Sequence, residues 1–145
     1  MSASISFRGY KQRRKLARSV VEWFFNHRKL NRFNVFLDII DRRCRSTDAI
    51  NGSCSTVDCM SRPRWFDIEM DNTQSESDYI TTLIHELVHV EQRLRGRHQH
   101  RVAWTDYSKW EGSVVSDDTP YRQQPWEIEA YRLEDKLYRM YLTTR

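Results

Sequence analysis

The chain has 145 residues, of which 39% are hydrophobic and 30% are charged, with only four glycines and three prolines. This composition excludes a fibrous or disordered protein and predicts one globular domain over residues 1–145. No segment is long and apolar enough to span a bilayer, and charged residues near the N-terminus exclude a signal peptide, so we expect a cytoplasmic protein. Cys44, Cys54 and Cys59 match no disulfide framework, so we expect reduced thiols.

Positive charge is concentrated at the N-terminal end. Residues 1–32 contain nine Lys or Arg and one Glu, a net charge of +8; since the whole chain carries +4, the remaining residues carry −4. A basic segment of this kind can attract nucleic acid or can form the solvated face of a helix. Because no base-reading motif accompanies it, nucleic acid is only a candidate partner.

The first half of the chain predicts a helix followed by strands. Apolar residues recur with helical spacing over residues 11–30, and apolar residues alternate over 32–41 and 64–71. An Asn51-Gly52 turn signal and the short run 55–60 lie between the two strands. We therefore expect an N-terminal helix and a small mixed sheet of about three strands.

The second half predicts two helices separated by a long loop. Ser and Asp residues offer N-caps for a helix over 76–95, which Gly96 ends. Residues 97–124 are polar with scattered aromatics and predict a long loop with a short hairpin near 110–115. Pro125 suits the first turn of a last helix, over 125–143. The predicted fold class is α+β.

The helix over 76–95 contains the sequence HELVH. His85 and His89 lie four residues apart, on one helix face, where two imidazoles can bind one zinc ion. Glu86 points beside the metal, where it can accept a proton from the zinc-bound water. Apolar neighbours on both sides predict a buried helix, which holds ligand geometry. The alternative is an amphipathic helix with two structural histidines.

A catalytic zinc ion needs a third protein ligand. The HExxHxxGxxH arrangement is excluded, because Gln92 and Arg95 stand where its glycine and its third histidine would be. Candidates remain in the segment RHQH and in the segment PWEIEA. They are His98, His100, Glu127 and Glu129.

These motifs resemble the small single-domain zinc peptidases of the gluzincin group, the minigluzincins and related phage-encoded SprT-like metallopeptidases. The resemblance covers roughly residues 55–140 and rests on HELVH followed, about forty residues later, by PWEIEA. It implies a zincin-like fold and a zinc endopeptidase that uses Glu86 as general base. It also implies Glu127 as third ligand, since Glu127 and Ala130 match the E-x-x-A pattern, whereas Tyr131 replaces the Asp or Asn that steadies a ligating histidine.

A second resemblance is to SprT proper and Spartan-type proteins, which use a third histidine and imply a DNA-associated protease. His98 or His100 would take that place here. We prefer Glu127, because it opens a well-patterned helix, whereas histidines in an Arg-rich loop are expected to be solvated. A third interpretation is an inactive remnant with an intact fold.

Further expectations concern the substrate and the setting of the site. The strand over 64–71 is expected to be the edge along which a peptide substrate lies. One of Tyr107, Tyr121 and Tyr131 is expected to donate to the oxyanion. We also expect a single catalytic Zn²⁺, a peptide or protein substrate, no membrane partner and a monomer, in the host cytoplasm if the protein is phage-encoded.

Overall fold

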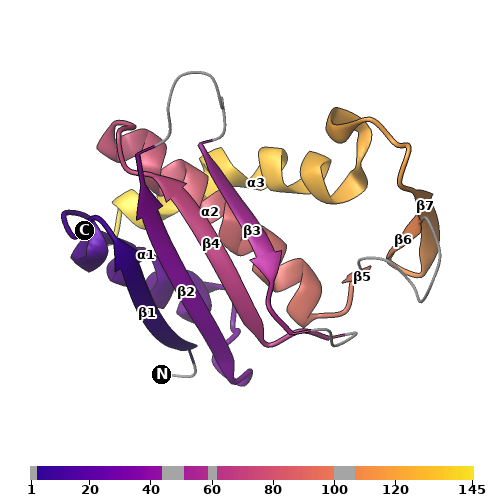
Figure 1. The fold of residues 1–145 in the computed structure, drawn as a ribbon, viewed down its shortest axis with the longest axis horizontal. Coiled ribbons are helices and arrows are strands. Elements are labelled where there is room, and N and C mark those ends of the chain that lie inside the picture. Colours follow the sequence, from indigo (N-terminus) through magenta and orange to yellow (C-terminus); the bar gives the residue numbers. More distant parts are fainter. Residues whose placement is uncertain (1–2, 44–50, 59–61, 100–106) are drawn as a thin grey trace.

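A mixed four-stranded sheet with helices packed on one face forms the body of the protein (Figure 1). The computed structural model describes residues 3–43, 51–58, 62–99 and 107–145. The strands lie in the order β1-β2-β4-β3; β1, β2 and β4 are parallel, and β3 is antiparallel to β4. This arrangement confirms the α+β class. The strands are β1 (Ala3–Gly9), β2 (Val35–Arg42), β3 (Gly52–Thr56) and β4 (Trp65–Asp71).

The sheet has one strand more than the expected three, and a strand precedes the first helix. In β1, Ala3, Ile5 and Phe7 alternate with Ser4, Ser6 and Arg8, and β1 pairs along its whole length with β2. Helix α1 (Arg14–His27) follows and is shorter than the predicted 11–30. We predicted no strand here, because the alternation in β1 covers only seven residues.

Strand β4 lies in the interior of the sheet, so the prediction that residues 64–71 form the edge strand is wrong. β4 is paired with β2 on one side and with β3 on the other. The short strand β3 therefore forms the edge. It begins at Gly52, within the predicted Asn51-Gly52 turn.

Helix α2 (Glu76–Leu94) confirms the predicted helix over 76–95. The Ser75 hydroxyl accepts a hydrogen bond from the backbone N–H of Asp78 at 3.2 Å and caps the first turn. Gly96 follows the last turn with φ +70°, a conformation that glycine adopts at low cost. Thirteen residues of α2 are buried, because the helix packs against the sheet and against helices α1 and α3. This burial fixes the two histidines firmly in the body of the protein.

The predicted long loop contains a second, small sheet. Its strands are β5 (His98–Gln99), β6 (Tyr107–Trp110) and β7 (Ser113–Ser116), in the order β5-β6-β7. The predicted hairpin is confirmed: β6 and β7 are joined by Glu111 and Gly112, both with positive φ, as a tight two-residue turn requires.

A short 3-10 helix, η1 (Tyr121–Gln123), leads into α3 (Pro125–Leu142), which confirms the last predicted helix. Figure 1 shows α3 crossing behind the sheet next to α2. Among the described residues, no helix combines the length and apolar character needed to cross a membrane. Cys54 carries a free, half-buried thiol, while Cys44 and Cys59 lie outside the described residues.

Candidate metal centre

Two histidines of α2 and one glutamate of α3 converge on one point. The Nε2 atoms of His85 and His89 each lie 3.1 Å from the same oxygen, Oε1 of Glu127. All three side chains are buried, and their candidate ligand atoms lie within 4.8 Å of one another. Two imidazole nitrogens and a carboxylate oxygen are donors that zinc accepts. His85, His89 and Glu127 could therefore hold a metal ion.

The far nitrogen of each imidazole is held by a second side chain. Nδ1 of His85 lies 2.7 Å from Oε2 of Glu134, and Nδ1 of His89 lies 2.9 Å from Oε1 of Gln92. Gln92 donates its Nε2 hydrogens to the Trp126 carbonyl and to Glu129, so its oxygen must accept the His89 proton. Both imidazoles thus carry the proton on Nδ1 and turn Nε2 towards Glu127, as metal-ligating histidines do.

Glu134 contacts His85 and so takes the role that the family pattern gives to an Asp or Asn at position 131, which steadies a ligating histidine. Tyr131 lies beside the His85 ring, at 4.7 Å between ring centroids, but it offers no carboxylate. Glu134 is seven residues after Glu127, so the two carboxylates lie on the same face of α3, two turns apart. Sequence reasoning missed Glu134 and Gln92; the spacing of seven from Glu127 and of three from His89 was the available signal.

The remaining candidate ligands do not join the three residues. The carboxylate of Glu129 contacts Gln92 and receives hydrogen bonds from Arg97. His98 is only 2% exposed and stacks on the Trp126 ring at 4.0 Å, so the expectation that it would be solvated is wrong. His100 lies outside the described residues.

Glu86 is buried next to the ligands and lines the same cleft. Burial raises the pKa of its carboxyl above the ordinary value, which His89 and His85 oppose and the charges of Glu127 and Glu134 reinforce. A carboxylate with a raised pKa holds a proton more readily at neutral pH. Glu86 is thus suited to accept a proton and to return it.

Tyr121 lies close to the three candidate ligands. Its hydroxyl donates to Oε1 of Glu127 at 3.0 Å and lies 3.4 Å from the Tyr131 hydroxyl. Burial and the neighbouring Tyr131 and Glu127 raise the pKa of Tyr121, so the hydroxyl stays a donor at neutral pH. The side chain of Tyr107 is not among those described.

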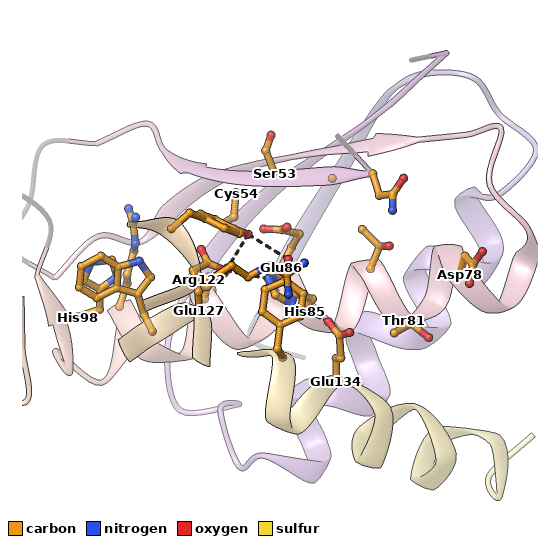
Figure 2. Close-up of a pocket in the computed structure, with 18 residues that line it drawn as sticks. Ser53, Cys54, Asp78, Thr81, His85, Glu86, His98, Arg122, Glu127 and Glu134 are labelled. Carbon is orange, nitrogen blue, oxygen red and sulfur yellow. Dashed lines mark hydrogen bonds and ion pairs between the residues drawn. The ribbon is translucent and has the colours of Figure 1, made fainter. Parts of the chain in front are cut away.

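A cleft of about 800 Å³ surrounds the three candidate ligands. Figure 2 shows His85, Glu86 and Glu127 in its middle, with His98 at one end and Asp78 and Thr81 at the other. Strand β3 forms one wall through Gly52, Ser53 and Cys54. None of the described residues before Asn51 lines the cleft, so the basic segment over 3–32 lies apart from it.

In comparisons with known proteins, no family model, no curated protein and no solved structure matches this chain.

Metal affinity at this site is expected to rise with pH. Burial lowers the pKa of His85, but its hydrogen bonds to Glu127 and Glu134 outweigh burial and raise the pKa to about 9. Below that pH a proton occupies the nitrogen that must bind the metal, so affinity should rise about tenfold per pH unit up to about pH 9 and then level off. Competition with a chromophoric zinc chelator across this range measures the rise.

The matched variant is Glu134→Gln, which removes one of the carboxylates that raise the pKa of His85. The levelling-off should then occur at lower pH, and the affinity at high pH should be about 10- to 100-fold weaker. An affinity that is independent of pH in the wild type, or a curve unchanged in Glu134→Gln, would contradict the assigned role of Glu134.

Proposed function

We propose that this protein is a zinc-dependent endopeptidase of the gluzincin type. The observation that carries the proposal is the convergence of His85, His89 and Glu127 on one point, with Glu86 beside it. A structural histidine pair would need neither a shared carboxylate nor a carboxylate or amide on each Nδ1. The donor set, its burial and its outer partners support a three-ligand zinc site.

The architecture supports the same proposal. An antiparallel edge strand, a helix carrying HELVH and a later helix carrying Glu127 lie together around one cleft. The resemblance to the minigluzincins and SprT-like peptidases implies a strand before the HELVH helix and a later helix that carries the third ligand, and we propose that the fold is zincin-like. Tyr131 departs from the family pattern, and the contact of Glu134 with His85 compensates for it.

When bound to His85, His89 and Glu127, zinc would polarise the scissile carbonyl and lower the pKa of a water molecule towards neutrality. Glu86 would take the proton from the attacking water and deliver it to the leaving amine, which balances the hydrolysis. The Tyr121 hydroxyl would donate to the oxygen of the scissile carbonyl as negative charge develops there. In the structure this hydroxyl donates to Oε1 of Glu127 at 3.0 Å, which places it next to the three candidate ligands.

The substrate would lie along β3. The outer edge of this strand carries no partner strand among the described residues, and the strand forms a wall of the cleft. An extended peptide can add to such an edge by main-chain hydrogen bonds, and antiparallel pairing gives the better hydrogen-bond geometry. We therefore assign to β3 the substrate-binding role that we had expected for residues 64–71.

The proposal is tested by metal-dependent hydrolysis of an unfolded protein. Purified protein should carry about one zinc ion per chain and cut a reduced, unfolded protein substrate into fragments. Dialysis against a chelator should abolish cutting, and stoichiometric zinc should restore it. Peptide ends are counted by mass spectrometry. Zinc-loaded protein that leaves every unfolded substrate whole would contradict the proposal.

A further inference from the structure

Two arginines line the cleft, Arg93 and Arg122, and neither forms an ion pair with a described residue. Arg122 lies over the Tyr131 ring, 4.5 Å from its centroid. Arg93 lies on α2, lines the cleft and is half-buried. Its Nε is buried and has no hydrogen-bond partner in the part of the chain that the structure describes. A buried donor without a partner is costly, so a guanidinium in this state is prepared to accept an anionic ligand.

The two arginines that follow Arg93 are both paired with acidic residues. Arg95 pairs with Glu91 at 2.9 Å, and Arg97 is held by Glu111 and Glu129. The acidic residues of the cleft are also engaged or distant from Arg93. Glu127 and Glu134 contact the histidines. On α2, Asp78 lies about four turns and Glu86 about two turns before Arg93. Arg93 therefore keeps its charge available to a molecule that enters the cleft.

The place of Arg93 along the cleft follows from helix periodicity. His85, His89 and Arg93 are spaced by four residues, so Arg93 lies one turn beyond the candidate metal ligands on the same face. This is the end of α2 that leads to His98, opposite the end with Asp78 and Thr81 (Figure 2). One end of the cleft, beyond His89, therefore carries the positive charge of Arg93, and the other end carries the negative charge of Asp78.

Strand β3 gives the cleft a direction. A Cβ on Gly52 would lie 2.7 Å from Thr82, whereas Cys54, two residues later, is close enough to Glu86 and Arg93 for their charges to act on its thiol. β3 and α2 therefore run the same way along the cleft. A peptide antiparallel to β3 runs the other way, with the residues before the scissile bond at the Arg93 end.

We propose that Arg93 selects substrates with an aspartate or glutamate on the N-terminal side of the scissile bond, by pairing with that side-chain carboxylate. This inference rests on the proposed function. The guanidinium offers a planar pair of donors that matches a carboxylate, and partial burial weakens the screening by water and salt.

The experiment compares peptides that differ at one position. A sequence that the wild type cuts is synthesised with Glu, Gln or Lys at each of the three positions before the scissile bond. At one of them, Glu should raise kcat/KM about 10- to 100-fold over Gln, as expected for a charge-assisted hydrogen bond in a half-buried site, and Lys should lower it. Arg93→Gln should remove the preference, and Arg93→Glu should make Lys the preferred residue.

The control variant is Arg139→Gln, which removes an exposed arginine on α3 outside the cleft and should keep the preference for Glu. Zinc content and thermal unfolding of each variant show that the fold is intact. A wild type that cuts peptides without preferring Glu, or a preference that survives in Arg93→Gln, overturns the inference and leaves the proposed function standing. A zinc-loaded wild type that cuts no peptide overturns both.

Discussion

Glu86→Gln should lower kcat/KM for peptide hydrolysis by about a hundredfold to ten-thousandfold while zinc stays bound, because the amide cannot take the proton of the attacking water. The other carboxylates close to the metal centre are engaged: Glu127 Oε1 contacts both histidines, and Glu134 contacts His85. Neither carboxylate can act as the base in place of Glu86 without giving up its contact with a histidine of the candidate metal centre. Steady-state kinetics on a quenched peptide, with zinc content determined for the same samples, measures the change.

The matched control is Glu69→Gln, a half-buried acid on β4 that pairs with Arg42 and does not line the cleft. Its activity should equal that of the wild type. Wild-type rates in Glu86→Gln would remove Glu86 as the base. Loss of zinc from Glu86→Gln would instead make Glu86 a structural part of the metal centre, which contradicts the proposed role.

Local patterns predicted the two helices that carry the candidate metal centre. The apolar rhythm of α2, its Ser75 cap and Gly96 all lie within about twenty residues, and the spacing of His85 and His89 is a property of one helix. Pro125 and the helix formers after it predicted α3 for the same reason. The sequence was sufficient to predict an arrangement of side chains where that arrangement depends on a single helix.

Strand order could not be predicted in this way. β4 alternates buried and half-buried residues as an edge strand would, yet β3 is inserted beside it by a long-range antiparallel pairing. β1 alternates apolar and polar residues over only seven positions, and its place in the sheet depends on pairing with β2. Pairing of strands distant in sequence leaves no local signature, so the edge of the sheet was assigned to the wrong strand.

The outer contacts of the metal centre were missed for a related reason. Glu134 and His85 are 49 residues apart, and they meet because α3 packs along α2. His98 stands in an Arg-rich segment that predicts exposure, but it is covered by Trp126 from the start of α3. Both contacts depend on the packing of two elements whose relative position the sequence did not specify.

Loss of the Glu127 carboxylate should empty the metal centre. In Glu127→Ala, two imidazoles remain where a three-ligand zinc site is needed, so zinc affinity should fall by more than the roughly 10- to 100-fold that loss of an outer hydrogen-bond partner costs. The Tyr121 hydroxyl loses its acceptor in the same variant. Zinc per chain after dialysis should fall from about one to near zero, and added zinc should no longer raise the unfolding temperature as it does when it binds the native state.

Glu129→Ala is the discriminating partner, because Glu129 lies two residues from Glu127 on the same helix and was itself a candidate ligand. Its carboxylate reaches the metal centre only through Gln92 and the Nδ1 atom of His89. Glu129→Ala should therefore keep zinc at about one per chain when zinc is in excess, and should weaken affinity about 10- to 100-fold at most, as for an outer partner. Equal loss of zinc from both variants, or full retention in Glu127→Ala, would show that the third ligand is not Glu127.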